Sequence, residues 1–260
     1  MVAGPYKTSN ALKTPVQRSA LQRAFNGVAR RFLSLMRVFR RNHLENLLIH
    51  EIERGRENRV EVLIGAGADL RAWNNRPLKK AAGRGQIEVL EVLFHHGIKA
   101  SDDDSVALQY AVNRGHIQTA RFLLQSGADI HARNEQAVIN AAARNSVPLM
   151  QMMIRAKADV NARNGEPLRL AASLGNYHVV KTLLDGGATA GLNDNAALME
   201  ACEKGFKNTI EYLVAHGADV NARSGLMLER VAAGGHILAL GVLLDAGAVF
   251  DPAVSKAAVL

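Results

Sequence analysis

Apolar and small residues return along this chain at a fixed interval of 30 residues. Leu168 and Ala171, for example, are three residues apart, which places both on one face of a helix. The leucine position recurs as Leu48, Leu78, Leu108, Val138, Leu168, Leu198 and Leu228. The alanine position recurs as Ala81, Ala111, Ala141, Ala171, Ala201 and Val231. The pattern predicts a first helix in each segment, with small side chains that let a neighbouring helix approach closely.

A second apolar group follows in each segment. Val179, Val180, Leu183 and Leu184 have the spacing of the apolar face of a second helix. A polar residue precedes each first helix and is expected to be a turn or N-cap residue. These residues are Asn74, Asp104, Asn134, Asn164, Asp194 and Ser224.

Glycine follows both helices, because the residue after a helix often adopts a positive φ that glycine tolerates cheaply. The first position holds Gly55, Gly85, Gly115, Asn145, Gly175, Gly205 and Gly235. The second holds Gly67, Gly97, Gly127, Lys157, Gly187, Gly217 and Gly247. Segment 131–160, with Asn145 and Lys157, is therefore the most irregular. We interpret it as drift within one repeat rather than as a bend or contact site, and expect Lys157 to cost stability.

One helix pair cannot bury its own apolar face, whereas stacked pairs can. The sequence therefore predicts an all-α solenoid of about seven helix-turn-helix repeats. The repeats are predicted at 41–70, 71–100, 101–130, 131–160, 161–190, 191–220 and 221–250. Residues 1–40 are predicted to form a basic N-terminal arm or capping helix, and residues 251–260 a C-terminal cap.

The repeat resembles the ankyrin repeat. Residues 160–189 read V-N-A-R-N-G-E-P-L-R-L-A-A-S-L-G-N-Y-H-V-V-K-T-L-L-D-G-G-A-T, which is similar to the family's consensus. The family's usual unit has about 33 residues, so this one is shorter, and its Thr-Pro-Leu-His signature is reduced to Glu166-Pro167-Leu168-Arg169. The missing residues fall between units, where the family makes a projecting β-turn finger. We expect blunted fingers with little or no β-hairpin, similar to the short repeats of giant DNA viruses and some bacteria.

Charge separates the first forty residues from the rest. The chain has 32 Lys and Arg against 24 Asp and Glu, a net charge of +8. Eight of the basic residues, and no acidic ones, lie in 1–40, so the remaining 24 balance the acids of 41–260. The arginines of this arm are Arg18, Arg23, Arg30, Arg31, Arg37 and Arg40.

Residues 14–40 have the pattern of an amphipathic basic helix, with Leu21, Phe25, Val28 and Phe32 spaced four, three and four apart. Three interpretations compete. The helix caps the apolar end of the stack, which we favour. It associates with an anionic membrane or directs the chain to mitochondria. It binds nucleic acid or a larger assembly.

In the family, partners contact the fingers and the exposed end of the first helix. Carried over to this sequence, that helix end is a column of mostly basic residues, here called the helix-end column. Its basic members are Arg54, Arg84, Arg114, Arg144 and Lys204. The finger column holds Trp73, Asp103, Arg133, Arg163, Asn193 and Arg223. If the resemblance holds, these columns form a positive stripe that favours an anionic partner, either an acidic protein surface or a nucleic-acid backbone.

Two alternatives stay open for these columns. The basic side chains are equally suited to helix C-termini, where they complement the helix dipole without any partner. Trp73, the single tryptophan, is either an exposed binding residue or a side chain packed against the preceding unit, and packing is the favoured interpretation.

No catalytic constellation is evident. His116 and His236 occupy the family's Gly-His position, where the histidine is structural, and Cys202 replaces an alanine of the packing column, which predicts a buried, inert thiol. The chain has no phosphate loop, nucleophile elbow or zinc motif. We therefore predict a non-catalytic protein with no cofactor, metal or small-molecule substrate.

The sequence favours a protein-protein interaction module or scaffold. One alternative is a subunit of a viral, ribonucleoprotein or organellar assembly, anchored by the arm; another is a pathogen effector or an inhibitor of a host enzyme. A single cysteine and the lack of a secretory signal or long apolar stretch predict an intracellular, non-secreted protein, with mitochondrial targeting as the alternative.

Overall fold

The computed structural model describes residues 42–223 and 225–250. The predicted arm and C-terminal cap, and with them Ser224, lie outside these residues. A helix runs through residues 42–53 and is followed by α2 (Glu57–Gly65). The later first helices are α3 (Ala72–Gly83), α5 (Asp102–Arg114), α7 (Ala132–Ala143), α9 (Ala162–Ser173), α11 (Leu192–Lys204) and α13 (Leu226–Ala233). The later second helices are α4 (Ile87–His95), α6 (Ile117–Gln125), α8 (Val147–Arg155), α10 (Tyr177–Asp185), α12 (Lys207–Ala215) and α14 (Ile237–Asp245).

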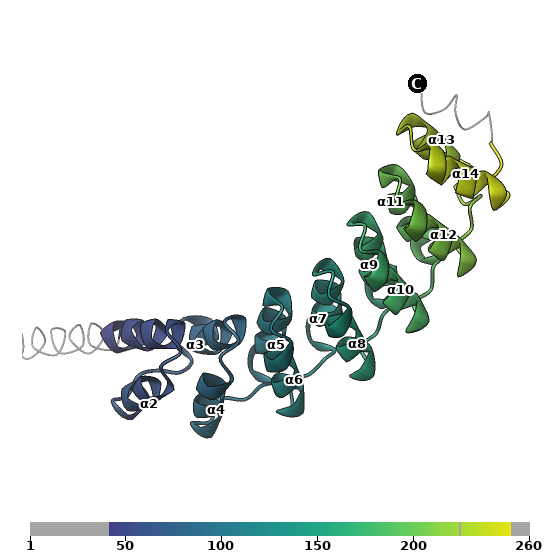
Figure 1. Cartoon of the computed structure of the whole chain (residues 1–260). Helices are drawn as coiled ribbons and strands as arrows, with labels where there is room; N and C mark the ends of the chain where they lie inside the picture. The colour runs from purple at the N-terminus through teal and green to yellow at the C-terminus, as the bar shows by residue number, and fades with distance from the viewer. Residues whose placement is uncertain (1–41, 224, 251–260) are drawn as a thin grey trace, which may run out of the picture.

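The helix pairs stack side by side into an arc (Figure 1). The first helices, α3 to α13, line the inner, concave side, and the second helices, α4 to α14, line the outer side. The described residues contain no β-strand, which confirms the expected all-α solenoid with blunted fingers. None of the helices that the structure describes is long and apolar enough to cross a bilayer.

The core follows the repeated alanine and leucine positions. Ala81, Ala111, Ala141, Ala171 and Ala201 have no exposed surface. One continuous cluster of buried side chains extends from Leu48 to Ala248, so each unit contributes to the burial of its neighbours. The alanines are therefore contact points at which the first helices approach each other closely.

A left-handed turn opens each first helix from α3 to α11. In α3, Trp73, Asn74 and Asn75 have φ values of 48°, 58° and 55°. The same three positions have positive φ in α5, α7, α9 and α11. Left-handed backbone costs about 1–2 kcal/mol per residue, and least for Gly, Asn and Asp. The middle position is Asn or Asp in all five turns.

This turn corrects one alternative of the sequence analysis. Asn74, Asp104, Asn134, Asn164 and Asp194 are turn residues and do not cap the helices through their side chains. The glycine positions behave as predicted. Gly175 has a φ of 69°, and the two substitutes, Asn145 and Lys157, have φ values of 49° and 65°.

Side chains also bridge the connections between units. At two of them a single asparagine satisfies both a backbone N–H and a backbone carbonyl. Asn161 accepts from the N–H of Thr189 at 2.8 Å and donates to the carbonyl of Gly187 at 3.2 Å. Asn221 makes the same two contacts, to Val249 at 2.7 Å and to Gly247 at 3.1 Å.

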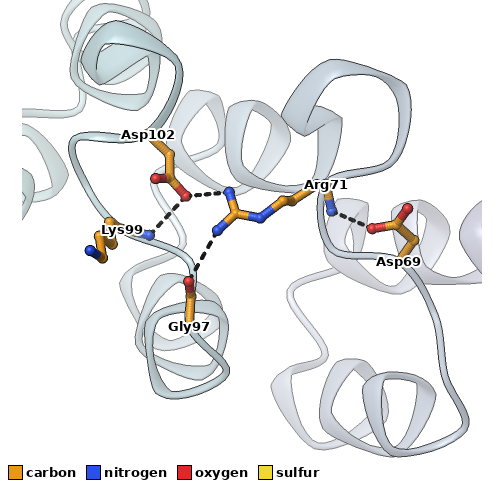
Figure 2. Close-up of polar contacts among 5 residues, drawn as sticks. All are labelled: Asp69, Arg71, Gly97, Lys99 and Asp102. Carbon is orange, nitrogen blue, oxygen red and sulfur yellow. Dashed lines mark hydrogen bonds and ion pairs between the residues drawn. The ribbon is translucent and has the colours of Figure 1, made fainter.

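Nearer the N-terminus, an ion pair between Arg71 and Asp102 binds the equivalent backbone carbonyl and N–H in place of an asparagine (Figure 2). Arg71 donates to the carbonyl of Gly97 at 3.2 Å, and Asp102 accepts from the N–H of Lys99 at 3.1 Å. The two side chains bind each other at 2.7 Å. Asp69 holds the backbone before them by accepting from the N–H of Arg71 at 2.9 Å.

Replacing Lys157 with glycine should stabilise the protein by about 1 kcal/mol, because the left-handed backbone no longer carries a Cβ. Lys157 is exposed, so no buried contact is lost. The control is Ala156→Gly at the adjacent residue, whose φ is −77° and which should lose stability. Urea unfolding measures both, and a Lys157→Gly variant no more stable than wild type contradicts the assigned strain.

The variant Asn161→Ala should lose about 0.5–1.5 kcal/mol, because the Thr189 N–H and the Gly187 carbonyl lose their side-chain partner. Asn113→Ala is the matched control, since Asn113 is exposed on α5 and alanine suits a helix. Thermal unfolding should separate the two variants. Equal midpoints would show that the bridge contributes nothing.

Candidate binding surface on the first helices

The helix-end column lies where the first helices end on the concave side. Arg84 and Arg144 are the C-cap residues of α3 and α7, while Arg114 and Lys204 are the last residues of α5 and α11. These four side chains, and that of Arg54, are exposed. None of the five forms an ion pair with another described residue. Their charges are therefore available to a binding partner.

The arginines of the finger column differ from those of the helix-end column, because they donate hydrogen bonds to the preceding unit. Arg133 donates to the carbonyl of Asp103 at 3.2 Å and pairs with its carboxylate at 3.1 Å. Arg163 donates to the carbonyl of Arg133 at 3.0 Å, and Arg223 to that of Asn193 at 3.5 Å. Each spans 30 residues, so these side chains link successive left-handed turns and have fewer donors left for a partner.

A cavity of about 830 Å³ opens between α3 and α5. It brings together three residues of the two predicted columns, Trp73, Arg84 and Arg114. It also contains His116, which the sequence predicts to be structural, and residues that were not predicted, among them Arg76, Lys79, Lys80 and Tyr110. These four residues belong to the body of α3 and α5, and no repeated column marks them.

The cavity is basic because only some of the Lys and Arg side chains that line it form ion pairs with carboxylates. Lys79 pairs with Asp103 at 2.7 Å, and Lys80 pairs with Glu53 at 2.6 Å. The hydrogen bond from Lys80 lowers the pKa of the Glu53 carboxyl, so this pair is ionised at neutral pH. Arg76, by contrast, forms no ion pair with a described residue.

Two aromatic side chains border the cavity. Trp73 is 42% exposed and Tyr110 is 43% exposed. Trp73 is therefore only partly covered, and its packing against the preceding unit, which the sequence favours, stays a prediction. The guanidinium of Arg76 lies over its ring, 5.4 Å from the ring centroid, in a cation–π contact.

His116 shapes one wall. Its Nε2 donates to the carbonyl of Gly83 at 3.0 Å, which confirms the predicted structural role. Gly85 lies below the ring with a φ of 76°, and a Cβ at that residue would come within 2.8 Å of the imidazole Nδ1. The glycine is thus required both by its backbone and by the ring above it.

The remaining candidate chemistry is structural. Cys202 is fully buried, and burial raises the pKa of its thiol to about 12, so the reactive thiolate is disfavoured. Across residues 42–223 and 225–250, no group of three or more His, Cys, Asp or Glu side chains is placed to hold a metal ion.

Comparisons with known proteins agree with this architecture. A family model described as ankyrin repeats (3 copies) matches residues 17–134 and 136–224. The first match begins within the segment predicted to be an arm or capping helix. The comparison with curated proteins found no match.

Solved structures of ankyrin repeat domains are similar to this chain. One from Acinetobacter baumannii AYE has 26% identity and a TM-score of 0.59, covering 66% of this chain and 98% of its own. That of Bcl-3, described as a unique member of the IkappaB protein family, has 25% identity and a TM-score of 0.58, covering 67% and 87%. The human ASB11 domain, at 21% identity and a TM-score of 0.58, covers 66% and 84% and shares the fold.

Proposed function

Because the chain belongs to the ankyrin repeat family, whose repeat domains are generally protein-protein interaction modules, we propose that it is a non-catalytic scaffold that binds an acidic protein partner. The binding surface is the concave row of first helices, centred on α3, α5 and α7. The observation that carries the proposal is the helix-end column, whose exposed arginines form no ion pair with a described residue.

Electrostatics favours this surface over the convex one. On the convex side, α2 and α4 carry Glu57, Glu61, Glu88 and Glu91 against a single arginine, Arg59, so this part of the convex surface is acidic. On the concave side, Arg84, Arg114 and Arg144 follow one another in consecutive units. Like charges at this spacing repel each other weakly in free solution, and an acidic surface relieves that repulsion while steering association.

The triple variant Arg84→Gln, Arg114→Gln, Arg144→Gln should lose partner binding by at least about tenfold at low salt. Affinity capture from an extract of the source cells, quantified by mass spectrometry, measures this. The effect should shrink as salt rises, because screening already weakens the exposed charges of the wild type.

The matched control is the triple variant Arg121→Gln, Arg155→Gln, Lys181→Gln, which removes the same charge from exposed sites on α6, α8 and α10. It should retain the partner. Both variants keep residues 1–40 unchanged, so a difference between them reports on the repeat surface. Equal capture by both triples and by wild type would rule out the helix-end column as the binding site.

A further inference from the structure

The cavity between α3 and α5 combines two recognition elements that a merely basic face does not need. One is the set of arginines that form no ion pair with a described residue, Arg76, Arg84 and Arg114, of which the first two lie near enough to the Glu53 carboxyl to help lower its pKa. The other is the pair of half-exposed rings, Trp73 and Tyr110. Its volume of about 830 Å³ suffices for several side chains of a bound segment. The ligand must therefore offer both negative charge and flat apolar surface.

The arginine beside Trp73 is held in place before any ligand arrives. Stacking of Arg76 on the indole restrains its guanidinium and leaves the N–H edge open to an acceptor. Trp73 itself belongs to the left-handed turn that opens α3, so its backbone is restrained as well. Such a site loses little conformational freedom when it binds a carboxylate.

The helix-end column adds a repeat distance. Arg84, Arg114 and Arg144 occupy equivalent ends of adjacent first helices, and packed helices lie about 8–10 Å apart. Two of the side chains extend towards the preceding unit: the stem of Arg114 lies near Gly83, and the guanidinium of Arg144 lies near Gly115. Each unit therefore contributes one cation to this row.

Only some backbone conformations present side chains on one face at that interval. A β-strand advances about 10 Å in three residues but turns the third side chain to the opposite face. A polyproline II helix has three residues per turn and advances about 9.3 Å, so every third side chain returns to the same face. Its proline rings also pack on exposed aromatic side chains.

Resting on the proposed function, we propose that the concave surface binds a polyproline II segment of its partner with an acidic residue at every third position. Successive carboxylates pair with Arg84, Arg114 and Arg144. The proline rings between the first two enter the cavity and pack against Trp73 and Tyr110. Arg76, beside Trp73 near the start of α3, supplies further hydrogen-bond donors to the cavity.

The full chain reports on this binding directly, because Trp73 is its only tryptophan. The probe is a blocked peptide of repeated Glu-Pro-Pro triplets, titrated while the indole emission is followed. The comparison peptide has the same residues, but its glutamates are separated by single prolines and the remaining prolines follow at its C-terminal end. Proline keeps it in the same helix, so its carboxylates point to different faces. The triplet peptide should bind about tenfold more tightly, since it makes additional arginine–carboxylate pairs.

Two variants distinguish recognition of the carboxylate spacing, here called the register, from simple attraction to positive charge. Arg114→Gln should remove the preference for the triplet peptide, whereas Arg121→Gln, an equal charge change on α6, should keep it. Equal affinity for the two peptides, both weakened by Arg114→Gln, would overturn the register while leaving an acidic partner on this surface. Tighter binding of an α-helical peptide with Glu at every seventh position, or of an oligothymidylate, would overturn the proposed conformation or ligand class.

Comparing the peptide titration with capture of the cellular partner distinguishes failure of this inference from failure of the proposed function. If neither peptide alters Trp73 emission, yet the concave triple variant loses the cellular partner, the register inference alone is wrong. If the triplet preference is present and the concave triple variant still retains that partner, the cavity binds such segments but the partner is held elsewhere on the chain.

Discussion

A helix pair of this size cannot bury its own apolar face, and the rest of the structure follows from that constraint. Each first helix presents a leucine and an alanine to the next unit, and residues such as Leu78 and Ala81 lose all their exposed surface in the stack. Burial is therefore a property of neighbouring units rather than of any single unit. It also favours a regular period, because an insertion within a helix would move its leucine and alanine out of register with those of the neighbouring units.

Close stacking in turn requires a compact reversal between units. The left-handed turn supplies it without a β-hairpin, at an energetic cost that Asn and Asp keep low. Side-chain contacts stabilise these turns and connections. They are the hydrogen bonds of the finger-column arginines and the bridges made by Asn161, Asn221 and the Arg71–Asp102 pair. All of them satisfy backbone groups that the connection leaves open, so much of the polar surface here is structural.

The same geometry separates two classes of basic residue that look alike in the sequence. Arg133 and Arg163 are held against the preceding turn, whereas Arg84 and Arg114 end their helices without a carboxylate partner in the described structure. Arginines whose N–H groups are already hydrogen-bonded to the protein have fewer donors left for a ligand than exposed arginines that form no ion pair. The candidate site is therefore narrower than the two columns together, and it centres on α3 and α5.

The sequence by itself determined the period, the two helices per unit, the positive φ of the glycine positions and the inert burial of Cys202, because each depends on local spacing or on one residue's conformational range. It also placed Arg84, Arg114 and Trp73 among the candidate residues. The tertiary structure alone decided that Arg76 lies over the partly exposed ring of Trp73 and that Tyr110 lines the same cavity. It also decided that Lys79 and Lys80 form ion pairs within the protein. The Arg76–Trp73 contact depends on the left-handed turn at the start of α3. The ion pairs of Lys79 and Lys80 connect neighbouring units, so they depend on the angle and distance at which those units pack, which a repeat pattern does not contain.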